Sequence, residues 1–316
     1  METAMIVLYQ AAVMFLMIVA GYLCYKIHII SPATNIQLSN LLLLVVNPCI
    51  IFISFQTDFD NRLAAGLLAA VGLSLLSIVI MQLLTRFLLK KSPENQYKVE
   101  RFGCIYTNCG FFATPLVLAM FGSEGVLYIT AYIATTNFFM WTQGIGVFTG
   151  KMKFKQLVNC LKAPTIIAIF LGIVFFFCRI RVPDFLFEPI SLIGKMNSPL
   201  AMIAAGAFIA QTDIVKAFAK LRLYWASIVR LLVIPLICIA LFILLPVDRT
   251  VALTVLVGAA APPAVSIMMF AAKYKCDELY AAEYFSVCTL ISIVSIPLMC
   301  FLYEWAGGLV SPFLPY

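Results

Sequence analysis

The sequence predicts an all-α protein that crosses a membrane many times, and its composition and its apolar runs both indicate this class. Of the 316 residues, 64% are hydrophobic and only 11% are charged, whereas globular domains carry roughly 25% charged residues. Apolar runs of roughly 20 residues recur from end to end, and a helix of that length crosses about 30 Å of hydrocarbon. The short alternating segments typical of a β-barrel are not found in the sequence. A soluble globular fold is therefore excluded.

Ten membrane spans are expected, joined by short connections and without an appended soluble domain. The first span follows the opening four residues without a basic segment or a cleavage site, so it is predicted to be a retained helix and not a signal peptide. The spans are predicted at 5–25, 37–56, 62–89, 100–121, 124–149, 163–179, 195–211, 223–246, 250–273 and 278–303.

The basic residues are distributed unequally between the two sides that these spans define. Sixteen Lys and Arg residues fall on one set of alternate loops and the adjoining span ends, and five fall on the other set. Cytoplasmic loops are enriched in Lys and Arg, so the basic loops are predicted to be cytoplasmic and both termini outside an inner (plasma) membrane. In a protein embedded in the lipid bilayer, these cytoplasmic loops account for the net charge of +7, and no nucleic-acid partner is expected.

The two halves of the chain show corresponding positions. Gly21 precedes Pro48 by 27 residues, and Gly172 precedes Pro199 by the same distance. Five spans per half is an odd number, so the second half must enter the membrane in the opposite orientation, as in inverted-repeat transporters. The predicted halves are residues 1–150 and 151–316.

Prolines at the centres of the fourth and ninth spans predict two broken helices. Pro115 and the Pro262-Pro263 pair remove backbone donors, and such backbone survives in a bilayer only where it is buried in protein or faces a cavity. If the two segments cross, half-helix N-termini near Leu116 and Ala264 would favour an anion. The candidate substrate-binding residues are Asn108, Cys109, Gly110, Thr114, Pro115, Leu116, Pro262, Pro263, Ala264, Val265 and Ser266, with the polar residues Asn47, Asn137 and Gln143.

Charged residues are not predicted near the centre of any span. Arg230 and Glu283 are expected within two turns of the cytoplasmic span ends, within reach of the interface. They either pair and line an inner gate or act as interfacial anchors. The deep polar residues likewise either line a cavity or hydrogen-bond between helices. Without a central carboxylate, the sequence gives no support to a proton relay.

The remaining chemistry-bearing residues indicate neither a cofactor nor an enzyme. The ten cysteines are scattered without a CxxC pair, and the single histidine, His28, is placed in a loop, so no zinc site or disulfide framework is expected. A membrane-embedded enzyme would require a catalytic pair at depth. The single histidine is placed in a loop, and no acidic residue is placed near the centre of a span. A channel would require a continuous polar stripe, whereas only a central polar cluster is found.

Several strings resemble the auxin efflux carrier family, in particular its compact prokaryotic members described as malate or malonate permeases. They are Asn-Cys-Gly-Phe-Phe-x-x-Pro-Leu at 108–116, Asn-Pro in the second span, and Ala-Pro-Pro-Ala at 261–264. The resemblance covers essentially the whole chain. It implies a homodimer in which spans 1, 2, 6 and 7 form a scaffold and spans 3–5 and 8–10 form a transport domain that moves as an elevator. It also implies that the substrates are small organic anions, such as malate, malonate or auxin-like acids, bound at the proline crossover.

Overall fold

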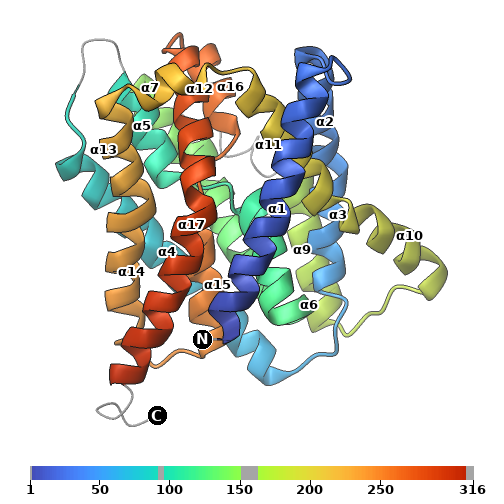
Figure 1. The fold of residues 1–316 in the computed structure, drawn as a ribbon. Coiled ribbons are helices and arrows are strands. Elements are labelled where there is room, and N and C mark those ends of the chain that lie inside the picture. The colour runs from blue at the N-terminus through green and yellow to red at the C-terminus, as the bar shows by residue number, and fades with distance from the viewer. Residues whose placement is uncertain (1, 92–95, 151–162, 311–316) are drawn as a thin grey trace.

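The computed structural model describes residues 2–91, 96–150 and 163–310, and these residues form helices without a strand (Figure 1). The basic segment 151–162 lies outside the described residues. The α-helices are α1 (Glu2–Lys26), α2 (Pro32–Leu41), α3 (Asn47–Ser54), α4 (Asn61–Leu88), α5 (Gln96–Ile105), α6 (Thr114–Phe139), α7 (Ile145–Thr149), α9 (Pro164–Phe177), α10 (Asp184–Lys195), α11 (Asn197–Ala210), α12 (Ile214–Phe218), α13 (Leu221–Ile228), α14 (Ile234–Phe242), α15 (Arg249–Ala260), α16 (Ser266–Lys273) and α17 (Glu278–Val310). Four π-helical turns join some of them: η1 (Leu42–Val46), η2 (Cys109–Ala113), η3 (Met140–Gly144) and η4 (Val229–Val233).

The helices confirm a protein that passes through a membrane several times. Seven helical stretches of the described chain are long and apolar enough to cross a bilayer, and two shorter apolar helices, α9 and α15, overlap the predicted sixth and ninth spans. The predicted fourth and fifth spans meet inside the continuous stretch Cys109–Thr149, where Gly122 takes φ 62° and ψ −146° and interrupts the helix. Glycine adopts this positive φ without steric cost. The number of ten spans stays a prediction.

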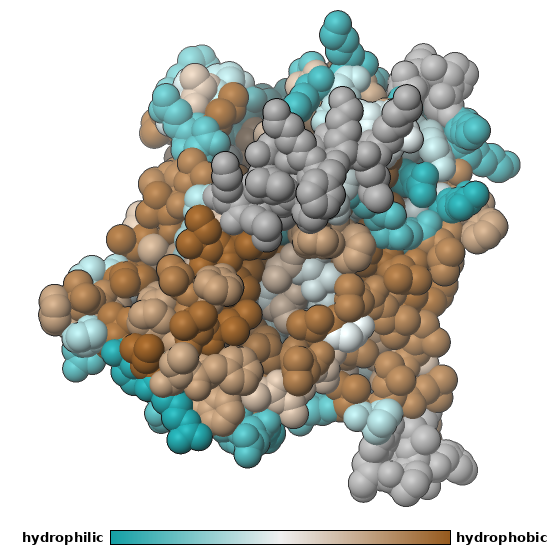
Figure 2. Space-filling model, turned by 180° about the vertical axis from the view of Figure 1, so that it is seen from behind, coloured by the Kyte–Doolittle hydropathy of each residue, from teal (hydrophilic) through white to brown (hydrophobic). Residues whose placement is uncertain are grey.

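The surface is divided into an apolar middle and two polar ends (Figure 2). Large apolar side chains are exposed on it, for example Leu68 at 72% and Phe87 at 79%. In water such a surface would aggregate, whereas lipid tails solvate it. The helix bundle has two ends. α1 ends and α12 lies at one of them, and α1 begins and α17 ends at the opposite one (Figure 1). The first of these is called the basic end below, because α1 ends there at Lys26, α12 contains Lys216, and Lys220 follows α12.

Proline shapes three of the four π turns. η1, η2 and η4 end two residues before Pro48, Pro115 and Pro235, respectively. A proline has no N–H for the carbonyl four residues earlier, and its ring clashes with that carbonyl. Widening the preceding turn relieves the clash while the helix continues. These prolines therefore modify their helices without ending them.

Helices α1 and α11 pack with their backbones in direct contact. A Cβ atom on Gly21 would overlap the carbonyl oxygen of Ile203, and one on Gly206 would overlap that of Ile18. Small residues allow this close approach, which replaces the hydrophobic effect as the attraction between helices in lipid. Gly172 has a similar role in α9, where a Cβ atom would overlap the ring of Phe55.

Substitution of Gly21 or Gly206 by Ala is expected to separate α1 from α11 and to lower the free energy of unfolding by about 1–3 kcal/mol, the usual cost of overpacking. Thermal unfolding in detergent measures the effect. Gly72→Ala is the matched control, because a Cβ atom on Gly72 meets nothing within 4 Å. Equal stability of the Gly21 and Gly72 variants would contradict the packing argument.

Candidate functional site

Two interrupted helices pair through their backbones at the centre of the molecule. The first gap separates α5 from η2, and the second separates α15 from α16. The N–H of Asn108 donates to the carbonyl of Pro262 at 2.8 Å, and the N–H of Ala264 donates to the carbonyl of Tyr106 at 3.0 Å. The two segments thus form an antiparallel bridge between Thr107 and Pro263. The crossing of the broken segments that the sequence predicts is therefore present.

A cavity of about 650 Å³ lies beside this crossover. Most of its lining is apolar, and its polar side chains are neutral amides and hydroxyls. Among the described residues that line it, none is an Asp, Glu, Lys, Arg or His. The polar lining residues are Ser39, Asn40, Asn47, Thr107, Asn108, Thr136, Asn137, Thr165 and Ser266, and the largest apolar ones are Phe111, Met140, Trp141, Phe208, Met268 and Met269.

Helix starts face this cavity from both breaks. Cys109, Gly110 and Phe111 form the first turn of η2 and line the cavity. The first backbone bond of that helix runs from Phe112 to Asn108, so the three preceding N–H groups have no acceptor within their own helix. Val265 and Ser266 stand at the start of α16 and also line the cavity. Partial positive charge is therefore directed at the cavity from two directions.

The structure brings eight of the predicted site residues to the cavity wall and leaves six outside it. Those in the wall are Asn47, Asn108, Cys109, Gly110, Asn137, Ala264, Val265 and Ser266. Those outside are Thr114, Pro115, Leu116, Pro262, Pro263 and Gln143. Of these, Pro262 and Pro263 form the crossover itself, while Gln143 accepts hydrogen bonds from Gln82 and from the Tyr106 hydroxyl and so joins neighbouring helices.

The predicted helix start near Leu116 is wrong. Leu116 is fully buried inside α6, and the helical path begins again about two turns earlier, at Cys109. The physical reason is that Pro115 only widens the turn before it. The real gap, at residues 106–108, is held open by the bonds to Pro262 and Ala264.

The interpretation of Arg230 as an interfacial anchor is also wrong. Its side chain is 0% exposed, and its guanidinium donates to the carbonyls of Ala259 (2.6 Å) and Ala261, directly before the second break. Glu283 is instead bound by Lys220, with 2.5 Å between Nζ and Oε2. A pair of Arg230 with Glu283 at an inner gate is therefore not present in this structure.

The model of a family described as membrane transport protein matches residues 6–159 and 145–300. An uncharacterized transporter of Methanocaldococcus jannaschii is 22% identical over 308 residues, which cover 90% of this chain and 95% of that protein.

The chain belongs to this membrane transport protein family, the auxin efflux carrier family. This agrees with the resemblance found in the sequence strings. It also establishes the chain as a multi-pass membrane protein of a transporter family.

Two polar contacts of this transporter were not expected from the sequence. Asn197, which is 0% exposed at the start of α11, donates from Nδ2 to the carbonyl of Gly110 at 3.1 Å. Asn47 approaches the same glycine, because a Cβ atom there would lie 3.3 Å from its Nδ2 atom. The two asparagines stand one and two residues before Pro48 and Pro199. This similar placement in the two halves could have indicated from the sequence that Asn197 lies near the site.

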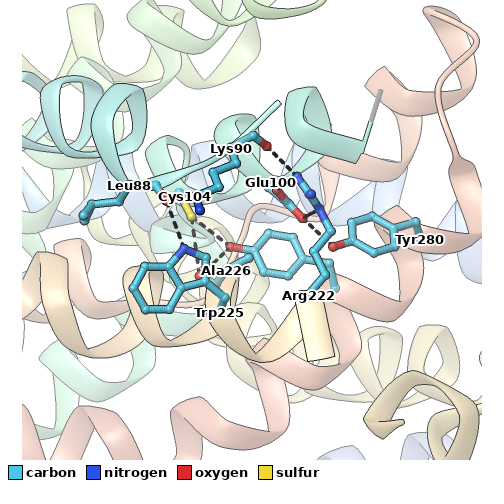
Figure 3. Close-up of polar contacts among 9 residues, drawn as sticks. Leu88, Lys90, Glu100, Cys104, Arg222, Trp225, Ala226 and Tyr280 are labelled. Atoms are coloured by element: carbon cyan, nitrogen blue, oxygen red, sulfur yellow. Dashed lines mark hydrogen bonds and ion pairs between the residues drawn. The ribbon is translucent and has the colours of Figure 1, made fainter. Parts of the chain in front are cut away.

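A cluster of polar and ionic contacts joins helices near the basic end of the transporter (Figure 3). Glu100 is 2% exposed and accepts from Arg222 at 2.5 and 2.8 Å and from the Tyr280 hydroxyl at 2.6 Å. Arg222 also donates to the carbonyl of Lys90, and the Trp225 indole donates to that of Leu88. These contacts join α5, α13 and α17 with the end of α4. We call Glu100, Arg222 and Tyr280 the basic-end clasp.

Replacement of Glu100 by Gln is expected to lower the free energy of unfolding by on the order of 1–3 kcal/mol, because Arg222 loses a charged acceptor in a largely buried position. Glu124→Gln is the control, since Glu124 pairs with an Arg62 that is 62% exposed, and exposed pairs contribute about 0–1 kcal/mol. The two variants are compared by thermal unfolding in detergent. Equal loss of stability in both would refute a structural role for the clasp.

Proposed function

We propose that this protein is a secondary carrier of small organic anions and that it binds them at the starts of η2 and α16. The observation that carries the proposal is the meeting of two helix starts at a central cavity whose described lining contains no acidic or basic side chain. Backbone N–H groups at a helix start bind anions without a fixed cation. In transporters with broken helices, half-helix N-termini hold anionic substrate groups in this way.

The lining also narrows the class of anion. Trp141, Met140, Phe208, Met268 and Met269 provide a large apolar surface, whereas the polar groups gather around Asn108 and Ser266. A carboxylate with one apolar body would place its charge at the helix starts and its body against these side chains. Malate and malonate carry a second carboxylate, which would be buried without a cation in the cavity wall. Auxin-like acids therefore fit the cavity better than small dicarboxylates.

The transport cycle that we propose is an elevator movement between ten spans arranged as two inverted halves. The reciprocal bonds between residues 106–108 and 262–264 support a two-fold relation between the halves. Gly21 of the first predicted span packs on α11, and Gly172 of the corresponding sixth span packs beside α3, which supports the same relation. The cavity is lined both by Asn40 and Thr165, from the proposed scaffold spans, and by residues of the crossover.

In this proposal α1–α3 and α9–α11 form a scaffold that dimerises, and the other helices carry the anion past it. The basic end faces the cytoplasm, in accord with the enrichment of Lys and Arg in cytoplasmic loops. Both termini then lie outside a plasma or inner membrane. No cofactor takes part in the proposed cycle.

Purified protein is expected to be stabilised more by indole-3-acetate or phenylacetate than by malate or malonate at equal concentration. A ligand that binds only the native state raises its apparent stability by mass action, by about 2.7 kcal/mol at one hundred times its Kd. Thermal unfolding in detergent with each acid measures this. Stabilisation by malate alone would contradict the assignment of substrate class, and stabilisation by no carboxylate would contradict the proposed function.

Asn108→Ala and Pro115→Ala are expected to reduce uptake of the best-stabilising acid into proteoliposomes by roughly tenfold or more, the effect of one lost charge-assisted hydrogen bond or of a displaced helix start. Asn61→Ala, at an exposed position at the beginning of α4, is the control. Unfolding temperatures of all three confirm that they fold. Uptake by the Asn108 and Pro115 variants at the control rate would refute the crossover site.

A further inference from the structure

Arg230 is a fully buried cation beside the crossover. It lies in η4, the π turn before Pro235, and its guanidinium donates to the carbonyls of Ala259 and Ala261. Its Nε atom is buried and has no hydrogen-bond partner among the described residues. None of the ion pairs found in the described part of the chain includes Arg230. A buried charge that lacks a counter-charge is costly, so this arrangement requires an explanation.

The carbonyls that Arg230 binds are those that the second break leaves without donors. In a continuous helix the carbonyl of Ala259 would accept from the N–H of residue 263, but Pro263 has none. Ala261 is already extended, with φ −61° and ψ 150°, so its carbonyl leaves the helix. The guanidinium replaces these missing donors with two of its own.

These carbonyls also form the negative end of the α15 dipole. Such an end carries about half an elementary charge, and in carriers with broken helices the carbonyl-bearing ends coordinate Na⁺ or another coupling cation. Here a covalently attached cation occupies that end. The full positive charge of Arg230 exceeds the partial negative charge at the end of α15. A net positive charge therefore remains at Ala261, in the same helix break as Ala264, which lines the cavity.

We propose that Arg230 is the permanent counter-charge of the transported anion and that it takes the place of a coupling cation at the end of α15. This inference rests on the proposed function. It specifies which positive charge the carrier uses in place of a coupling cation. When the cavity is empty, the buried charge is uncompensated. A bound carboxylate offsets it across the crossover. Arg230 is accordingly a positioning residue, which acts through the crossover backbone and does not line the cavity. Transport then needs neither Na⁺ nor another metal cation.

The first test compares wild-type proteoliposomes in sodium and in choline media. Uptake of the best-stabilising carboxylate is expected to have the same rate in both, and equilibrium binding of ²²Na⁺ to the purified protein is expected to show no saturable component. Sodium-dependent uptake or saturable ²²Na⁺ binding would overturn the proposal. The ²²Na⁺ measurement does not depend on the substrate, so it remains decisive if no carboxylate binds and the proposed function fails.

The second test separates charge from hydrogen bonding at position 230. Arg230→Lys keeps the charge and is expected to transport without sodium, whereas Arg230→Gln keeps hydrogen-bond donors without the charge. The latter is expected to reduce carboxylate affinity roughly tenfold to a hundredfold, the range for one charge-assisted interaction. Arg86→Gln, at an exposed position near the end of α4, is the matched control.

The outcomes of this series are distinct. If the Gln variant binds the carboxylate as tightly as the wild type while the Lys variant does not, Arg230 only caps the carbonyls and the proposal is wrong. If both variants fail to fold, the sodium comparison and the ²²Na⁺ binding of the wild-type protein decide alone.

Discussion

The structure depends on one constraint: backbone donors and acceptors inside a bilayer must be satisfied by the protein itself. Water is not available there, and each unsatisfied group costs several kcal/mol. Pro262 and Pro263 lack the N–H donors that would continue α15. The backbone groups at residues 106–108 and 262–264 bond to each other across the two breaks. Asn197 and Arg230 bind the neighbouring carbonyls of Gly110, Ala259 and Ala261. The crossover is thus stable because several separate elements complete it.

The same requirement determines where charge can reside. The carbonyl-bearing ends of the broken helices are occupied, one by the reciprocal backbone bond to Tyr106 and the other by Arg230. The helix starts at Cys109 and Val265 face the cavity. What remains toward the cavity is partial positive charge surrounded by apolar side chains. In our proposal this pattern explains how an anion is held in a cavity wall without a basic residue, and why the body of that anion is apolar.

The sequence predicted much of the fold and part of the site, and the two misses have separate physical causes. Composition and apolar runs predicted the helical membrane protein, and the central prolines predicted both broken segments and their crossing. The helix start was predicted near Leu116, and not at Cys109, because a proline can widen the preceding turn without ending the helix. Arg230 was misjudged because its distance along the span suggested an interface, whereas packing directs its side chain to carbonyls 29 and 31 residues later. Long-range partners of this kind have no local signal.

The central claim is that broken backbone, and not a charged side chain, holds the transported anion. The most direct measurement is an experimental structure of the protein with its best-stabilising carboxylate bound in a lipid environment. The account predicts carboxylate oxygens about 2.7–3.2 Å from backbone nitrogens of the first turn of η2 or of α16, with the apolar body against Trp141 and Met268. A carboxylate bound outside the cavity, or one held only by a Lys or Arg side chain, would contradict it.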